Sequence, residues 1–144
     1  MILVTVVGQA YTAAGYTLQE QPLKWAGGRF RFLKALSDTH YGIIEYQLLA
    51  YQDTMWSSGM PSRFNVTLIR ADNANGLESD DAEYVRRDLS ALVVEDFGVP
   101  ILPSATYWWQ FKTQDALGKA LAEAGHLTIG YAIPWLAGDL SPKG

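Results

Sequence analysis

The two histidines of this chain, His40 and His126, are the side chains best suited to proton transfer near neutral pH, because imidazole has an ordinary pKa of about 6.5. They lie far apart in the sequence, and the chain contains no HxH, HxxxH or HExxH spacing of the kind that holds a metal ion. His126 follows Gly125 at the expected end of a helix, where the helix dipole stabilises a cation. We therefore expect structural roles for both histidines, with no metal site and no cofactor.

Acidic residues form two groups, one from Glu78 to Glu83 and one at Glu95 and Asp96. Paired carboxylates perform acid–base chemistry or bind cations only where their surroundings shift a pKa or provide a cation. Asp80 and Glu83 have the spacing of a capping box, in which side-chain oxygens accept hydrogen bonds from the free amides of a helix start. The first group is therefore predicted to cap a helix.

Glu45 differs because it falls on the more polar side of a predicted strand, where Arg29, Arg31 or Arg63 of neighbouring strands can oppose it. Such an exposed cross-strand ion pair contributes at most about 1 kcal/mol to stability. If that face were covered instead, Glu45 would become the polar anchor of an aromatic-lined pocket. This alternative makes the chain a small-molecule binder or an enzyme, with a pocket formed by Arg31, His40, Glu45 and Tyr46.

The stretch from Arg29 to Arg70 positions these groups in three runs, RFRFLKAL, YGIIEYQLLAYQD and SRFNVTLIR, which turn-forming residues separate. In each run the even-numbered positions are the more apolar. Successive side chains of a strand point to opposite faces, so this alternation is typical of strands with one face in a core. A three-stranded antiparallel meander is predicted, with these residues facing the core: Phe30, Phe32, Leu36, Ile44, Tyr46, Leu48, Ala50, Phe64, Val66 and Leu68.

Apolar runs and spacings predict the remaining elements. Further strands are expected at 1–7, where β-branched and aliphatic residues form a continuous run, at 105–112 and at 126–133. Apolar residues three and four positions apart predict helices at about 81–96 and 114–124, the second capped by Thr113 and ended by Gly125. The predicted fold is α+β: an antiparallel, meander-containing sheet of about five strands, with two amphipathic helices packed mainly on one face.

The composition narrows the functional classes. We expect one globular domain, 1–144, because 144 residues are the usual size of one. The absence of cysteine excludes disulfides, thiolate catalysis and Cys-based metal sites. A net charge of -4 with a pI near 5.0 makes nucleic acid an unlikely partner. The apolar start is too short for a signal peptide or a membrane span, so we expect no membrane association and a cytoplasmic location.

The side of the predicted sheet that faces away from the helices, here called the outer face, carries more apolar residues than a solvated surface needs. The chain's own residues 9–26 would cover it, or a partner would, since soluble monomers rarely expose large apolar patches. The Met- and Trp-bearing connection 54–62 points to a partner as well. We therefore predict a non-catalytic protein-interaction or assembly module, an accessory subunit or a self-associating unit. Its candidate interface is Leu33, Ile43, Leu49, Tyr51, Trp56, Ile69 and Trp108.

Overall fold

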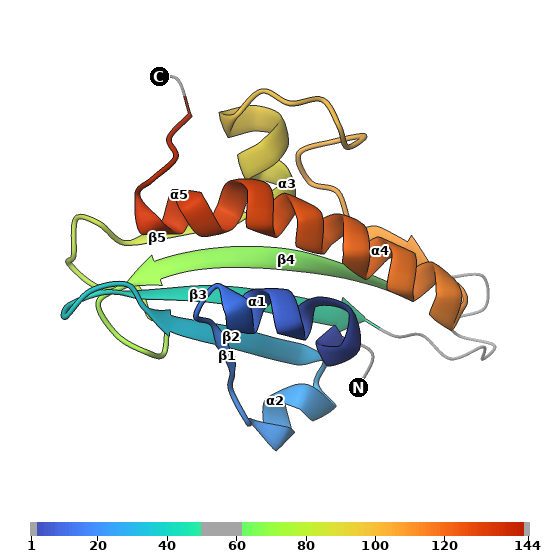
Figure 1. The fold of residues 1–144 in the computed structure, drawn as a ribbon, viewed down its shortest axis with the longest axis horizontal. Coiled ribbons are helices and arrows are strands. Elements are labelled where there is room, and N and C mark those ends of the chain that lie inside the picture. The colour runs from blue at the N-terminus through green and yellow to red at the C-terminus, as the bar shows by residue number, and fades with distance from the viewer. Residues whose placement is uncertain (1–2, 50–61, 143–144) are drawn as a thin grey trace.

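The structure is a computed structural model that describes residues 3–49 and 62–142 (Figure 1). Within these residues, six strands form one antiparallel sheet. Five are hydrogen-bonded in the order β1-β2-β3-β4-β5, and β6 pairs with the first residues of β4. The predicted α+β class and the predicted meander are confirmed. The strands are β1 (Thr17–Leu18), β2 (Arg29–Ala35), β3 (Tyr41–Leu49), β4 (Ser62–Ala71), β5 (Val85–Asp88) and β6 (Trp109–Phe111).

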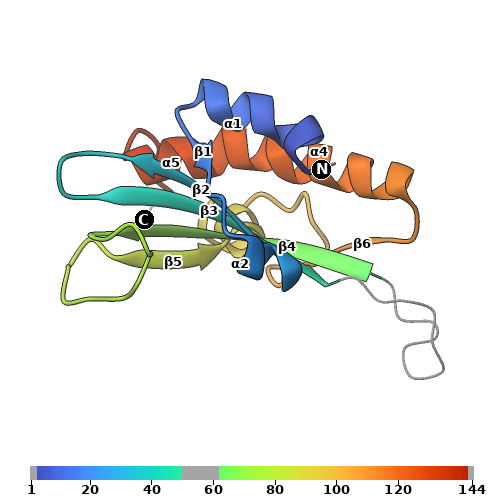
Figure 2. The ribbon, with the colours of Figure 1, turned by 90° about the horizontal axis from the view of Figure 1, so that it is seen from below.

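Helical segments cover the face of the sheet that carries the even-numbered residues of β2, β3 and β4. Figure 2 shows α1 and α4 on this side and the loop between β4 and β5 on the other. Three of these segments, named α4, η3 and α5 in the list that follows, are continuous and make a helix of 24 residues, 114–137. The segments are the π-helical turn η1 (Val4–Gly8), α1 (Gln9–Ala13), α2 (Pro22–Ala26), α3 (Leu89–Ala91), the π-helical turn η2 (Leu92–Asp96), α4 (Gln114–Leu127), the π-helical turn η3 (Thr128–Ala132) and α5 (Ile133–Ala137).

The core between the sheet and these helices is built on aromatic rings. Phe64 of β4 stacks on Trp109 of β6 with ring centroids 5.4 Å apart, and Tyr11 of α1 meets Phe32 edge to face at 4.9 Å. The hydroxyl groups of Tyr11 and Tyr46 lie 2.6 Å apart in a fully buried hydrogen bond. The sheet side and the helix side of the core are thus joined both by packing and by a buried hydrogen bond.

The prediction of a strand at 1–7 is wrong, because the described part of this run is helical from Leu3 onwards. In this helical segment, which continues through α1, Leu3, Val7 and Tyr11 recur every four positions and are buried in the core, while Val4 and Thr5 are exposed. A short apolar run has no period that separates a strand from a buried helix, so β-branched composition alone gave the wrong element.

The predicted helix at 81–96 is wrong in its first half. Residues 85–88 form β5, which pairs with 67–70 of β4, and helical structure begins only at Leu89. Pairing satisfies backbone groups of β4 that would otherwise lack partners at a sheet edge. The predicted capping role of Asp80 and Glu83 is therefore also wrong, since no helix starts there.

The predicted strand at 126–133 is also wrong, because the helix capped by Thr113 continues past Gly125 to Ala137. Gly125 allows a close approach of η1 to α4: a Cβ there would lie 2.9 Å from Cγ1 of Val7. The glycine that ends the helix is Gly138, with a left-handed φ of 83°.

Candidate functional site

Most of the candidate site residues predicted from the sequence lie on the outer face of the sheet. The register of β2, β3 and β4 with their neighbours arranges its side chains in rows across the strands. From the β2–β3 turn toward the far end of the sheet, these rows are Leu33, Ile43 and Ile69; then Arg31, Glu45, Thr67 and Asp88; then Arg29, Gln47 and Asn65; then Leu49, Arg63 and Gln110.

The apolar row is closed by the chain's own loop between β4 and β5, residues 72–84. Ile43 and Ile69 have no exposed surface and form a small second core with Ala71. Gly76 of the loop lies against them, because a Cβ at this position would be 2.7 Å from Cδ1 of Ile43. Ile43 and Ile69 were predicted to lie in a candidate interface covered by residues 9–26 or by a partner, whereas the chain's own 72–84 loop covers them.

The second row holds a buried ion pair. Nε of Arg31 donates to Oε1 of Glu45 at 2.8 Å, and the guanidinium of Arg86 lies 3.7 Å from the other carboxylate oxygen. Nη1 of Arg31 also donates to the carbonyl of Asn75 at 2.6 Å, so the 72–84 loop is tied to this pair. Glu45 therefore acts as a structural anchor whose charge is matched on two sides.

The last two rows and Trp108, which lies against Arg63, form the far end of the outer face, here called the open end because Arg29 and Gln110 are exposed there. It comprises Arg29, Gln47, Leu49, Arg63, Asn65, Trp108 and Gln110. The guanidinium of Arg63 lies over the ring of Trp108, 4.8 Å from its centroid. Nε of Arg63 and Oδ1 of Asn65 are buried atoms that find no hydrogen-bond partner in the described part of the chain. Nε of Arg29 donates to Gln47 at 2.8 Å. This end of the face presents cations, amides and an indole.

The structure divides the predicted interface. Leu49 and Trp108 lie half-buried at the open end, while Leu33 packs against the closed pair of isoleucines. Tyr51 and Trp56 lie outside the described residues.

The four residues of the alternative pocket do not converge on one cavity. Arg31 and Glu45 face the outer side of the sheet, whereas Tyr46 is buried on the inner side against Tyr11. His40 lies at the β2–β3 turn and contacts other residues, described next. Burial raises the pKa of Tyr46 well above its ordinary value, and it raises the pKa of Tyr11 to about 12, so both hydroxyls stay protonated as core groups.

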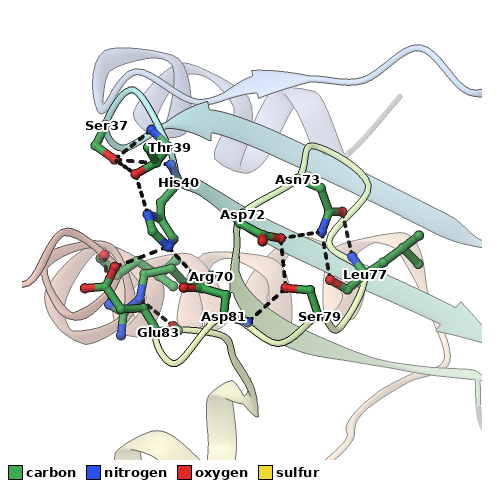
Figure 3. Close-up of polar contacts among 11 residues, drawn as sticks. Ser37, Thr39, His40, Arg70, Asp72, Asn73, Leu77, Ser79, Asp81 and Glu83 are labelled. Atoms are coloured by element: carbon green, nitrogen blue, oxygen red, sulfur yellow. Dashed lines mark hydrogen bonds and ion pairs between the residues drawn. The ribbon is translucent and has the colours of Figure 1, made fainter.

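His40 meets two carboxylates of the 72–84 loop, and the three residues are here called the His40 cluster (Figure 3). Nε2 of His40 lies 2.7 Å from Oδ2 of Asp81 and 3.2 Å from Oε2 of Glu83. Its other ring nitrogen, Nδ1, lies 2.8 Å from the hydroxyl of Thr39. The side chains of His40 and Asp81 are mostly buried, whereas that of Glu83 is 66% exposed. The cluster joins the β2–β3 turn to the loop that closes the apolar row.

The most enclosed apolar cavity described lies in the core at the far end of the sheet. It has a volume of about 60 Å³ and is lined by Leu3, Phe30, Tyr46, Leu48, Phe64, Leu117 and Leu121. Pockets for drug-sized ligands usually measure about 300–1,000 Å³. A gap of this size does not hold a metabolite.

Sequence reasoning missed the two arrangements that matter most, the covering loop and the His40 cluster. Both depend on contacts between residues more than thirty positions apart, such as His40 with Asp81, which no local spacing reveals. One signal was present in the sequence: the NANG segment ends in Gly76, whose φ of 70° marks a tight turn that brings backbone close to the sheet.

Comparison of the chain with protein-family models, curated proteins and solved structures found no match. Among the described residues, no helix has the length and apolar character needed to cross a bilayer.

Proposed function

We propose that this chain is a non-catalytic protein-interaction module that binds an acidic segment of a different protein across the open end of its outer face. The observation that carries the proposal is the Arg63–Trp108 pair, with its guanidinium 4.8 Å from the ring centroid. Tryptophan and arginine are the residue types most enriched among those that dominate binding energy in protein interfaces. A stacked arginine is also held in a fixed geometry, which lowers the entropy lost on binding.

Unpaired polar groups beside this pair favour a hydrogen-bonding partner. A buried donor without a partner costs about 1–3 kcal/mol, and Nε of Arg63 is such a donor within the described residues. A carboxylate is the acceptor that fits a guanidinium best, because two parallel N–H···O bonds form. Because Nε itself is buried, an acidic side chain of the partner would bind this guanidinium through its Nη groups.

The charge of the open end favours an acidic partner. Neither Arg29 nor Arg63 has an ion pair among the described residues, in contrast to Arg31 and Arg87. One strand separates them and Arg63 lies two residues further along the sheet, so their Cα atoms are about 12 Å apart at the usual strand spacings. An extended peptide advances about 3.3 Å per residue and its side chains alternate between two sides, so acidic residues four positions apart, on one side of the peptide, would match the two guanidiniums.

A second copy of this chain fits the open end less well. A two-fold dimer through this surface is isologous, which places the same patch on both sides of the interface. Arg29 and Arg63 would then face further arginines, and like charges brought together across an interface cost affinity. The proposal is therefore a heterologous complex.

The test is selection of random twelve-residue peptides displayed on phage against the immobilised full chain. We expect enriched peptides to carry Asp or Glu four positions apart, and their binding to weaken as salt is raised. The same peptides should fail to bind the Arg63→Gln, Trp108→Ala double variant. Lys119→Gln is the matched control, because Lys119 is exposed on α4, on the other side of the sheet, and should bind like the parent.

Two results would contradict the proposal: enrichment without acidic residues, or equal binding by the double variant. A melting curve for each variant distinguishes loss of binding from loss of folding. The milder Arg63→Lys change keeps the charge and removes the planar guanidinium, so it should weaken binding even where the double variant fails to fold.

A further inference from the structure

We propose that the His40 cluster is a site for a divalent cation of the zinc class, which fastens the 72–84 loop to the β2–β3 turn. The inference is independent of the peptide-binding proposal, since the site lies at the opposite end of the outer face. One imidazole nitrogen and two carboxylate oxygens come together here, and these ligand atoms all lie within 4.8 Å of one another. They come from two separate segments of the chain, which a cation would join.

The spacing of the ligand atoms suits a tetrahedral ion. Zinc lies about 2.0–2.2 Å from nitrogen and oxygen ligands, which places two ligand atoms of a tetrahedron about 3.3 Å apart. The distance from Nε2 of His40 to Glu83 is already 3.2 Å, and that to Asp81 is 2.7 Å. Side-chain rotation of Asp81 would lengthen its distance to Nε2 from 2.7 Å to about 3.3 Å, and the three ligand atoms, which lie within 4.8 Å of one another, would close on the ion.

The electrostatics of the cluster call for a positive charge between its members. Two carboxylates face the same ring nitrogen, so an Nε2 lone pair alone would be repelled by both. Either a proton on Nε2 or a metal ion removes this repulsion, and the metal satisfies all three groups at once. The hydroxyl of Thr39, 2.8 Å from Nδ1, can accept a hydrogen bond from Nδ1–H, and in this tautomer the Nε2 lone pair is directed at the carboxylates.

The backbone on both sides of the cluster is held by other contacts, as Figure 3 shows. The hydroxyl of Ser37 accepts from the amide of His40, and Nε of Arg70 donates to the carbonyl of Glu83 at 3.1 Å. The amide of Asp81 donates to Ser79, whose hydroxyl donates to Asp72. The ligands are thus pre-positioned, which reduces the ordering cost of binding an ion.

The donor set indicates which ion is favoured. Imidazole suits zinc, copper, nickel and iron, whereas magnesium and calcium prefer oxygen ligands alone. Three protein ligands leave a fourth position for water, and the exposed Glu83 gives an ion access from solvent. Asp72 adds a further carboxylate nearby, and hydrogen bonds from Asn73 and Ser79 lower its pKa.

The test is calorimetric titration of the chelator-treated full chain with zinc chloride, followed by titration with magnesium chloride. We expect one zinc ion per chain and no measurable binding of magnesium. His40→Ala and Asp81→Asn should each weaken zinc binding by more than about tenfold. His126→Ala and Asp80→Asn are the matched controls, since His126 is the other histidine and is exposed, and Asp80 is the acid next to Asp81; both variants should bind zinc like the parent.

A second measurement reports on the loop itself. Amide hydrogen exchange across 72–84 should slow when zinc is added to the parent chain and should not change in His40→Ala, because the ion joins the loop to the turn. Zinc binding of unchanged strength in His40→Ala would overturn the proposal. So would loss of binding in His126→Ala, or exchange in 72–84 that zinc does not alter.

Discussion

Replacement of Gly76 by alanine tests whether the 72–84 loop closes the apolar row of the outer face. Gly76 has a φ of 70°, in the left-handed region that L-residues avoid at a cost of about 1–2 kcal/mol. The added Cβ would lie 2.7 Å from Cδ1 of Ile43, a contact too close to persist without movement. Overpacking of this kind costs about 1–3 kcal/mol. Gly76→Ala should therefore lower the free energy of unfolding by about 2–5 kcal/mol.

Two comparison variants separate these contributions in urea unfolding. Gly98 has nearly the same φ, 69°, but a Cβ there would meet nothing within 4 Å, so Gly98→Ala should show the backbone cost alone. Ile43→Val removes Cδ1, the atom that the new Cβ would strike, and costs about 0.5–1.5 kcal/mol by itself. In the Gly76→Ala background this second change should be neutral or stabilising. Equal losses for Gly76→Ala and Gly98→Ala, with no coupling to Ile43, would refute the closure of this face by the loop.

Further predictions concern the core and the long helix. Tyr11→Phe should cost about 1 kcal/mol in urea unfolding, because it removes the buried hydrogen bond between the hydroxyls of Tyr11 and Tyr46, and adding Tyr46→Phe should cost less than the sum of the two single changes. Burial raises the pKa of Tyr11 and of Tyr16 to about 12 and that of Tyr46 well above its ordinary value. Stability should therefore be complete below about pH 10 and fall between about pH 10 and 12 by about 1.4 kcal/mol per pH unit for each of these tyrosines, measured by urea unfolding alongside an ultraviolet titration. Thr113→Ala should cost about 1 kcal/mol by thermal unfolding, since its hydroxyl accepts from the amide of Ala116 at the helix start, and Thr113→Ser should recover most of this.

The alternation along the meander made its strands and inward-facing residues predictable. Phe32, Ile44, Tyr46 and Phe64 all lie where their even numbers place them, because a strand allows only two directions for a side chain. The Thr113 cap was equally local and is confirmed by its hydrogen bond to Ala116. Where a short-range rule determines an element, the sequence was sufficient to predict that element.

The elements predicted wrongly are those that tertiary contacts decide. Val4–Gly8 and 126–133 are apolar runs that satisfy a strand or a buried helix equally well, and their packing partners are distant in sequence. Val85–Asp88 became a strand because β4 offered an unpaired edge. The His40 cluster joins residues from a turn and a loop, and the loop first had to fold onto Ile43 and Ile69.

Titration of the isotope-labelled chain with a selected acidic peptide, followed by nuclear magnetic resonance, tests the proposed interface most directly. The indole N–H signal of Trp108 and the Nε–H signals of Arg29 and Arg63 lie in the same spectrum, and a Trp108→Phe variant identifies the indole. We predict that these three signals shift together, saturate at one peptide per chain, and do not shift in Arg63→Gln. Shifts confined to the indoles of Trp25 or Trp135, with those of Trp108 and both arginines unchanged, would contradict binding at the open end.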